Sequence, residues 1–455
     1  MSALPQERIH TEEGKQPMFQ KLKSLIFNKE IRNAGWIIGE QIFQMAISLV
    51  VGVLSARYLG PGNYGTLNYT ASFVNFVLPI ATLSMEGVVI KKMIAAPEDE
   101  GVYLGSCMLF RLVASLISSA IIFLIVAFLN PDDRLKWALV LIQSLQLCFR
   151  AVFILDSWFQ RHLKSRYVSI GKMISCVLVA AYKIFLLATA KSVIWFAFSN
   201  TLTDMIIAIV LYYFYRRDGK DKLTVSREKG IDVLRESYHF ILSGLMGAVY
   251  SQMDRIMLGS MMTDYDVGLY TTATALCGMW IFVPTAVINS FRPKIMELKK
   301  AGEEEAYQRR LEQLYSFIIW LCIAACTGVC ILARFIVGTL YGEAYLGAVQ
   351  ALRIVIWFET FAMIGTARGI WILCEGKNRY VKYYLGIGAA VNLILNWLMI
   401  PAWGINGAAL ATLITQIVTS LIAPLLFRAT RYHTTIVLRS FALRWWFEMR
   451  ERSES

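Results

Sequence analysis

Long apolar blocks alternate with short polar segments along the whole chain. The blocks 33–56, 102–129 and 193–215 each approach the ~20 residues with which an α-helix crosses ~30 Å of hydrocarbon. Because a segment inside a bilayer must satisfy its own backbone hydrogen bonds, we expect every block to be helical. Twelve membrane spans are expected in all: 33–56, 64–86, 102–129, 136–158, 167–189, 193–215, 237–260, 266–290, 314–338, 349–374, 381–401 and 405–428.

Composition excludes a soluble fold. The 455 residues are 57% hydrophobic and 17% charged, with a mean hydropathy of +0.52, whereas soluble domains are roughly a quarter charged. The first 32 residues are polar, and the apolar block that follows is too long for a cleavable signal peptide. The sequence therefore predicts an all-α integral membrane protein that retains its first span.

Basic residues indicate which side of the membrane each loop faces. Most of the 45 lysines and arginines lie before the first span, after the even-numbered spans and after the last span. This distribution predicts cytoplasmic termini. It also explains the net charge of +13 without nucleic acid as a partner. The opposite ends of the spans carry only Arg57, Arg134, Lys136, Lys191 and Arg334.

The two halves of the chain resemble each other. In each half, a Leu-Gly pair is followed by a second glycine, a Tyr-Thr pair, an alanine and a proline within a helix. Six spans per half give both halves the same orientation, as in transporters built from parallel repeats with a substrate path between them. A chance likeness of two apolar hairpins is the alternative. The matching residues are Leu59-Gly60, Gly65, Tyr69-Thr70, Ala71 and Pro79, and then Leu258-Gly259, Gly268, Tyr270-Thr271, Ala273 and Pro284.

This repeat predicts the division of the chain into domains. Two six-helix lobes are flanked and joined by cytoplasmic segments, and the basic C-terminal tail is expected to lie along the inner leaflet. The expected boundaries are an N-terminal segment 1–32, an N-lobe 33–215, an inter-lobe loop 216–236, a C-lobe 237–428 and a tail 429–455.

Charged residues inside the predicted spans carry the candidate chemistry. Each costs roughly 2.5–3.5 kcal/mol on insertion, so such residues usually face a cavity or one another. Lys172, Arg353 and Asp156 lie near span ends, where snorkelling to the interface explains them. The full set is Glu40, Arg111, Arg150, Asp156, Lys172, Lys183, Asp204, Asp254, Arg255, Arg353, Glu359 and Arg368.

The basic majority of this set predicts a cationic lumen for an anionic ligand such as a pyrophosphate head group, since arginine binds phosphate oxygens in pairs. The acidic members are candidates for coupling to a proton or sodium gradient. Ion pairing between helices is the structural alternative. The substrate-binding candidates are Arg111, Arg150, Lys183, Arg255 and Arg368, and the coupling candidates are Glu40, Asp204, Asp254 and Glu359.

Signals for catalysis or a cofactor are missing from the sequence. The four histidines are scattered, and no metalloprotease, P-loop or nucleophile-elbow motif is present. The eight cysteines lie in or beside apolar spans without CxxC spacing, which favours small buried side chains over a metal site. We therefore expect a transporter rather than an enzyme, with no cofactor and no metal.

Four segments, in order along nearly the whole chain, resemble the Wzx-type polysaccharide repeat-unit flippases. These flippases belong to the polysaccharide transporter family of the multidrug/oligosaccharidyl-lipid/polysaccharide exporter superfamily. The segments are Ala56-Arg57-Tyr58-Leu59-Gly60-Pro61 with Tyr64-Gly65, Asp254-Arg255-Ile256-Met257-Leu258-Gly259 with Val267-Gly268-Leu269-Tyr270, Leu340-Tyr341-Gly342-Glu343-Ala344-Tyr345, and Asn392-Leu393-Ile394-Leu395-Asn396 with Gly404-Ile405-Asn406-Gly407-Ala408-Ala409.

The resemblance implies a V-shaped pair of six-helix lobes that works by alternating access. Its implied substrate is an undecaprenyl-pyrophosphate-linked oligosaccharide repeat unit, of O-antigen or a similar surface polysaccharide, moved from the inner to the outer leaflet of a bacterial inner membrane. A polymerase and a chain-length regulator are the implied partners. Related lipid II flippases carry two further C-terminal helices, which the twelve predicted spans do not include.

Three alternatives remain open from the residues. A multidrug exporter of the same superfamily should have an acidic lumen for organic cations. A membrane polymerase or ligase acting on the same glycans typically presents a large external loop, and the predicted external loops are short. A membrane scaffold would give no reason for deep charges on most helices.

Overall fold

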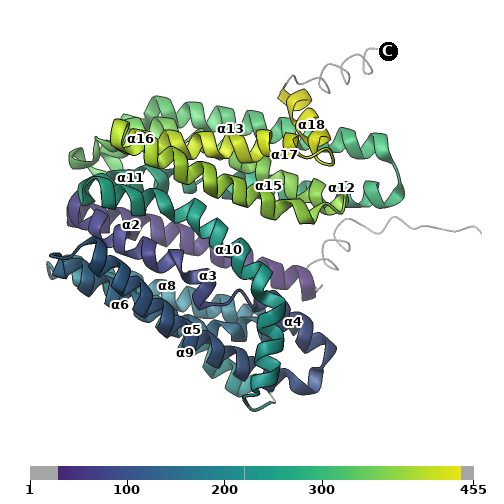
Figure 1. The fold of residues 1–455 in the computed structure, drawn as a ribbon, viewed down its shortest axis with the longest axis horizontal. Helices are drawn as coiled ribbons and strands as arrows, with labels where there is room; N and C mark the ends of the chain where they lie inside the picture. The colour runs from purple at the N-terminus through teal and green to yellow at the C-terminus, as the bar shows by residue number, and fades with distance from the viewer. Residues whose placement is uncertain (1–28, 220, 442–455) are drawn as a thin grey trace, which may run out of the picture.

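The computed structural model describes residues 29–219 and 221–441, and its regular elements in these ranges are all helices. The all-α expectation is therefore confirmed for this part of the chain. Most of the predicted N-terminal segment and the last residues of the tail lie outside the described residues. Figure 1 shows the long helices packed as a bundle.

The helices of the first half are α2 (Lys29–Phe76), α3 (Leu78–Ala81), α4 (Glu86–Ala95), α5 (Glu100–Leu129), α6 (Arg134–Arg150), α7 (Leu155–Arg161), α8 (Ser165–Ala188) and α9 (Val193–Asp218). Those of the second half are α10 (Arg227–Met261), α11 (Asp264–Gly278), α12 (Phe282–Ala301), α13 (Glu304–Tyr341), α14 (Ala348–Val355), α15 (Phe358–Cys374), α16 (Val381–Ile417), α17 (Ala423–Leu426) and α18 (Arg431–Phe441). A π-helical stretch, Val418–Ile422, joins α16 to α17.

Nine stretches within the described residues are long and apolar enough to cross a membrane. Two of them bend sharply at a glycine with positive φ, namely Gly60 in α2 (φ 71°) and Gly404 in α16 (φ 54°). Each of these two stretches therefore contains two crossings. Helix α10 is also long enough to cross, with 35 residues, although it is more polar. The helices thus accommodate the twelve expected spans.

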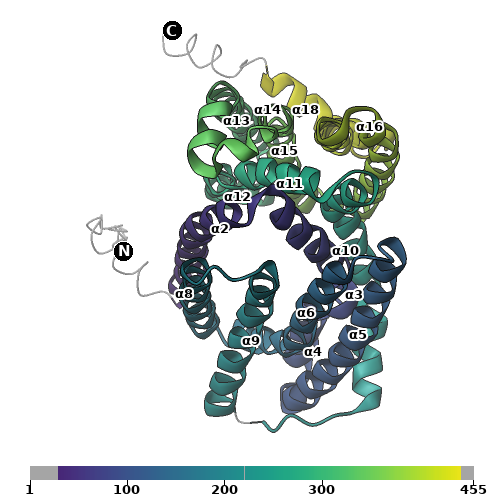
Figure 2. The ribbon, with the colours of Figure 1, turned by 90° about the vertical axis from the view of Figure 1, so that its left-hand side faces the viewer.

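The helices diverge from one end of the molecule, as in a V. In Figure 1, α2 and α11 lie together at the left, where α2 bends and α11 begins, and the helices of the two halves separate toward the right. Figure 2, seen from that left-hand end, again places α11 beside α2. We call the end where α2 bends and α11 begins the closed end.

Two glycines make a reciprocal contact at the closed end. A Cβ on Gly65 of α2 would lie 1.6 Å from the carbonyl oxygen of Asp264, and a Cβ on Gly268 of α11 would lie 2.0 Å from the carbonyl oxygen of Pro61. Pro61 precedes Gly65 by as many positions as Asp264 precedes Gly268. The same residues of the two halves therefore meet symmetrically, which is the contact expected of a two-fold repeat, and only glycine fits this approach.

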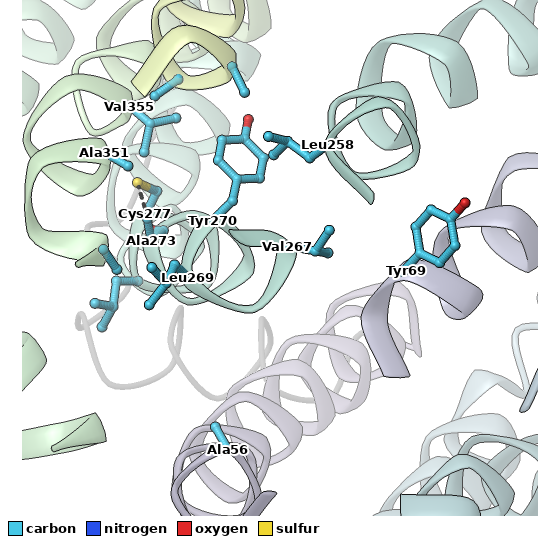
Figure 3. Packing of buried hydrophobic residues seen from close by; sticks show 14 of the residues in the cluster. Ala56, Tyr69, Leu258, Val267, Leu269, Tyr270, Ala273, Cys277, Ala351 and Val355 are labelled. Atoms are coloured by element: carbon cyan, nitrogen blue, oxygen red, sulfur yellow. Dashed lines mark hydrogen bonds between the residues drawn. The ribbon is translucent and has the colours of Figure 1, made fainter. Parts of the chain in front are cut away.

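The core beneath this contact joins the two halves. Tyr69 of α2 is fully buried with Leu258 of α10 and Val267 of α11 in one hydrophobic cluster. Figure 3 shows side chains of α2, α10, α11 and α14 in this cluster. Because lipid tails are as apolar as these side chains, close van der Waals packing rather than exclusion from water stabilises the closed end.

Helix α10 contacts helices of both halves of the chain. Its first turns lie inside the predicted loop 216–236, where Lys92 of α4 forms an ion pair of 2.5 Å with Asp232 of α10 and Lys91 pairs with Glu236. The hydrogen bond to Asp232 raises the pKa of the Lys92 ammonium. The later turns of α10 pack on α16 instead. Helix α10 thus begins inside the predicted inter-lobe segment 216–236, where the ion pairs with α4 stabilise its first turns.

Helix α18 packs on the second half of the chain. His433 is fully buried, with its Nε2 atom 2.8 Å from the Tyr315 hydroxyl of α13, and the Ser316 hydroxyl donates to the Ser440 carbonyl at 2.7 Å. From the sequence we expect the tail to lie along the inner leaflet. In the described part of the tail, one face of α18 is buried against the second half of the chain. The apolar residues of the tail do not by themselves show whether they face the membrane or other helices.

Candidate functional site

Residues of α2, α6, α8 and α9, together with Asp156 of α7, line a partly open polar cavity of about 550 Å³ in the first half of the chain. We call it the N-half cavity. Gln44 and Ser48 of α2 and Asn200 and Asp204 of α9 line this cavity. Gln143 does not belong to its lining but is fully buried and donates to the Leu67 carbonyl at 3.2 Å.

Two of the basic residues at the N-half cavity are paired with carboxylates. Arg150 Nε lies 2.5 Å from Asp204 Oδ2, and Lys172 Nζ lies 3.6 Å from Glu40 Oε2. Both carboxylates are buried. Asp204 and Glu40 thus balance charge inside the first half.

Lys183 differs from these residues. It lines the N-half cavity from α8, and no carboxylate of the described residues lies within 4.0 Å of its ammonium group. A lysine inside a membrane span without a carboxylate partner is costly. Its charge is therefore available to an anion in the cavity.

Arg111 lies in a different environment. Its side chain is 1% exposed, and its Nη2 donates to Glu86 Oε1 at 2.9 Å. Glu86 therefore compensates its charge at the base of α4. Sequence reasoning placed Arg111 with the cavity residues, because the pattern does not show which carboxylate lies near a given arginine.

Asp254 of α10 is the centre of a buried polar cluster in the second half. Its Oδ1 accepts hydrogen bonds from the side-chain amides of Asn392 at 3.0 Å and Asn396 at 2.5 Å. Its Oδ2 accepts from the Tyr270 hydroxyl at 2.7 Å and the Thr412 hydroxyl at 2.6 Å. We call these residues the Asp254 cluster.

Two oxygens of this cluster have no donor among the described residues. They are the side-chain carbonyl oxygens of Asn392 and Asn396, whose side chains are fully buried. Turning either amide over would place its oxygen against the Asp254 carboxylate, which is electrostatically unfavourable. A carboxylate with two free amide oxygens suits a hard cation such as sodium, which takes oxygen ligands.

Arg255 and Glu359 border a neighbouring cavity of about 180 Å³. Arg255 Nη2 donates to the Thr274 hydroxyl at 3.1 Å, and no carboxylate of the described part of the chain lies within 4.0 Å of its guanidinium. Glu359 is 2% exposed, and its Oε2 has no hydrogen-bond donor among these residues. Arg255 thus supplies a second unpaired cation.

Arg368 borders a third cavity, of about 320 Å³, between α10, α15 and α16. It too has no carboxylate within 4.0 Å among the described residues. Tyr250 and Phe358 border both this cavity and the Arg255 cavity. The described structure therefore places unpaired basic groups at cavities in both halves of the chain.

Sequence reasoning found some of these groups and missed others. Asp254 was identified as a coupling candidate, and Asn392 and Asn396, four positions apart on one face of α16, both donate to it. Tyr270 and Thr412 were not identified as partners of Asp254, since no local pattern links residues so far apart in the chain. The described residues contain no group of three or more His, Cys, Asp or Glu side chains arranged to hold a metal ion.

The sequence matches a known family. The family model described as polysaccharide biosynthesis protein matches residues 31–290, which is more than half of the chain. A Haloferax volcanii protein named "Probable low-salt glycan biosynthesis flippase Agl15" is 22% identical over 392 residues, which cover 84% of this chain and 80% of its own. A Shigella dysenteriae protein named "Putative O-antigen transporter" is 24% identical over 284 residues, which cover 61% of this chain and 69% of its own.

Solved structures share the fold. The lipid II flippase MurJ, in an inward closed conformation, matches with a TM-score of 0.73 at 15% identity, covering 91% of this chain and 92% of that one. A MATE multidrug transporter in an inward-facing conformation matches with a TM-score of 0.61 at 14% identity, covering 87% and 98%. At these identities the likeness establishes the fold, and it agrees with the all-α membrane fold expected from the sequence.

Proposed function

The chain belongs to the polysaccharide biosynthesis protein family, and from that premise we propose that it is a flippase for a lipid-linked oligosaccharide. Its proposed substrate is an undecaprenyl-pyrophosphate-linked repeat unit of O-antigen or a similar surface polysaccharide. The relatives named as a glycan flippase and an O-antigen transporter support this assignment. The protein transports its substrate and makes or breaks no covalent bond in it.

The unpaired basic residues at the cavities are the observation that carries this proposal. Lys183, Arg255 and Arg368 border cavities in both halves and have no carboxylate partner within 4.0 Å in the described part of the chain. A pyrophosphate group offers the oxygens that such side chains bind. Glu359 lies at the Arg255 cavity without a hydrogen-bond donor at Oε2, so an export assay, rather than the cavity charge alone, separates a glycan flippase from an exporter of organic cations. Arg150 contributes to the same lumen once a ligand competes with Asp204.

The proposed orientation follows from the loop charges. Both termini lie in the cytoplasm of a bacterial cell with the protein in the inner membrane, and the closed end is therefore external. The diverging end then receives the substrate from the inner leaflet. Separation of α2 from α11 at the closed end would release the sugar outside by alternating access. A polymerase and a chain-length regulator are the partners that would use the exported unit.

We assign the coupling ion to the Asp254 cluster. The free oxygens of Asn392 and Asn396 beside the Asp254 carboxylate support a sodium ion there. Sodium at this position would bind α10 and α16 together, and α10 also contacts α4. Glu359, Asp204 and Glu40 remain candidates for proton coupling. Asp204 pairs with Arg150 and Glu40 with Lys172, whereas Glu359 Oε2 has no hydrogen-bond donor among the described residues.

The function is tested by measuring surface-glycan export in cells whose own copy of this gene is deleted and which express a wild-type or variant copy instead. We expect Lys183→Ala and Arg255→Ala to abolish export at normal protein level in the membrane. Arg353→Ala is the matched control, because Arg353 is a basic residue exposed at the surface of α14, and it should export normally. Unchanged export in both cavity variants would refute the cationic lumen, and resistance to organic cations without glycan export would favour a multidrug exporter.

A further inference from the structure

The start of α8 and the end of α9 lie beside each other at the diverging end of the molecule. The two helices run antiparallel, and the Ser175 hydroxyl of α8 donates to the Thr203 carbonyl of α9 at 2.9 Å. The loop that joins them is at the closed end, because the Lys191 carbonyl accepts a hydrogen bond of 3.1 Å from the Tyr58 hydroxyl, just before the bend of α2. Residues at the other ends of both apolar helices therefore lie at the level of the lipid head groups.

Two arginines converge on one tyrosine at this level. Arg166 Nη2 of α8 donates to the Tyr167 hydroxyl at 3.0 Å, and Arg217 Nη2 of α9 donates to the same hydroxyl at 3.4 Å. The two guanidinium carbons lie 4.7 and 5.7 Å from the centre of the Tyr167 ring. This ring is buried and lies 4.7 Å from the ring of Phe214. Two like charges are therefore held close together on a fixed aromatic support.

Carboxylates balance this positive charge incompletely. Asp218 Oδ1 lies 3.1 Å from Arg217 Nε, and Asp218 Oδ2 lies 3.5 Å from Lys164 Nζ. Arg166 has no carboxylate within 4.0 Å among the described residues. It also lies in the first turn of α8, where the helix dipole adds positive potential. Three basic side chains thus share one carboxylate, and an anion between them would be stabilised.

Apolar surface continues from both arginines along the helices. On α9 the exposed side chains of Ile209 and Tyr213 lie eight and four positions before Arg217, on the same helix face. On α8 the exposed Val177 lies eleven positions after Arg166, which is about three turns and again the same face. None of these five residues belongs to the lining of the N-half cavity, as the structure describes it. The surface therefore faces the surrounding lipid.

We call Lys164, Arg166, Tyr167 and Arg217 the Tyr167 patch, and we propose that it binds one anionic phospholipid of the surrounding membrane. The phosphodiester lies between the two guanidinium groups, since arginine binds phosphate oxygens in pairs. The acyl chains follow the apolar surfaces of α8 and α9. Basic sites beside membrane helices on the cytoplasmic side recognise such head groups. The surplus of positive charge favours an anionic lipid over a zwitterionic one, and the apolar surface favours a lipid over a soluble phosphate.

This site is separate from transport. The patch is on the outer face of the first half, and its ligand stays in the bilayer. Binding of the phospholipid does not depend on the proposed flippase function. The proposed orientation adds that the lipid comes from the cytoplasmic leaflet. A protein that binds the phospholipid but exports no glycan would therefore refute the proposed function and leave this site intact.

Native mass spectrometry of the purified full chain, titrated with phosphatidylglycerol in detergent, tests the site. Arg166→Gln and Arg217→Gln should each weaken binding of the first lipid about fivefold, as expected for one basic residue at an anionic membrane surface. The double variant should weaken it further. Arg227→Gln is the matched control, because it removes the same charge from an exposed position at the start of α10, and it should bind as the wild type does.

A structural role of the arginines gives a different result. If they only support Tyr167, both single variants lower the melting temperature in the absence of added lipid but keep the affinity for phosphatidylglycerol, and the proposal is overturned. An equal loss of affinity in Arg227→Gln overturns it too, because net charge rather than the patch would then attract the lipid. Weaker binding in the patch variants at an unchanged melting temperature supports it.

Competition identifies the ligand. Phosphatidylcholine and glycerol phosphate should displace phosphatidylglycerol poorly, since the first has no net charge and the second has no acyl chains. Equal displacement by phosphatidylcholine would contradict recognition of an anionic head group, and equal displacement by glycerol phosphate would indicate a site for soluble phosphate. Tighter binding of undecaprenyl phosphate than of phosphatidylglycerol, lost in the patch variants, would assign the patch to the carrier lipid and overturn the proposal.

Discussion

An ion pair between the two halves holds the closed end. Lys136 Nζ at the start of α6 lies 3.0 Å from Asp264 Oδ1 at the start of α11, and the Thr66 hydroxyl of α2 donates to Asp264 Oδ2 at 2.9 Å. The Asp264 side chain is 23% exposed and that of Lys136 is 10% exposed. Asp264→Asn removes the charge, keeps the side-chain size and leaves the Lys136 ammonium without its partner across the contact.

The cost of this change follows from the degree of burial. Breaking a fully buried pair costs about 3–5 kcal/mol, whereas an exposed pair contributes about 0–1 kcal/mol. The Lys136 ammonium retains Asn130 Oδ1 at 3.1 Å and Asp133 Oδ2 at 3.6 Å, which compensate part of the loss. We therefore expect the closed end to lose about 1–2 kcal/mol, which is roughly a five- to thirtyfold change in the ratio of closed to open molecules.

Single-molecule energy transfer between dyes on unnatural amino acids at positions 132 and 343, both exposed near the closed end, measures this ratio. Asp264→Asn should increase the population with widely separated dyes, and Lys136→Gln should do the same. The double variant should cost less than the sum of the two single variants, because the pair is already broken. Asp133→Asn is the control that keeps the pair across the contact.

An unchanged distance distribution in Asp264→Asn would refute the reasoning. An equally large opening of the closed end in Asp133→Asn would refute it as well, because that variant keeps the ion pair between Lys136 and Asp264. Strictly additive effects of Asp264→Asn and Lys136→Gln would also contradict an interaction between them.

Two further changes test the packing and the ion site. Gly268→Ala places a methyl group where the Pro61 carbonyl lies 2.0 Å away, so it should open the closed end in the same dye measurement, whereas Gly278→Ala, with open space at its Cβ position, should not. If sodium binds the Asp254 cluster, sodium chloride should raise the melting temperature of the wild-type protein above that in choline chloride. Asp254→Asn should abolish this rise, whereas Glu359→Gln should preserve it. A rise in Asp254→Asn equal to that of the wild type would exclude sodium from the cluster.

The spans and the repeat could be predicted from sequence because they depend on local composition. An apolar block of about twenty residues has few alternatives to a membrane helix. Gly65 and Gly268 occupy matching positions in the two halves of the sequence, and they meet across the repeat in the structure. The sharp bends at Gly60 and Gly404 agree with the span boundaries expected there.

The partners of the charged residues could not be predicted, because they come from distant parts of the chain. Arg150 pairs with Asp204 on another helix, and Arg111 pairs with Glu86. Hydrophobic periodicity identifies a polar face but not the residue opposite it. For this reason the sequence predicts five basic residues together at the lumen. In the described structure Arg111 and Arg150 pair with carboxylates, and the other three have no carboxylate partner within 4.0 Å.

Transport by the purified protein in liposomes is the most direct test of the proposed flippase. A fluorescent undecaprenyl-pyrophosphate-linked oligosaccharide in the inner leaflet should reach the outer leaflet far faster with the wild-type protein than in protein-free liposomes. The Lys183→Ala,Arg255→Ala double variant should move it no faster than protein-free liposomes do. Transport by this double variant at the wild-type rate would contradict the cationic lumen, and a wild-type rate equal to that of protein-free liposomes would contradict the flippase itself.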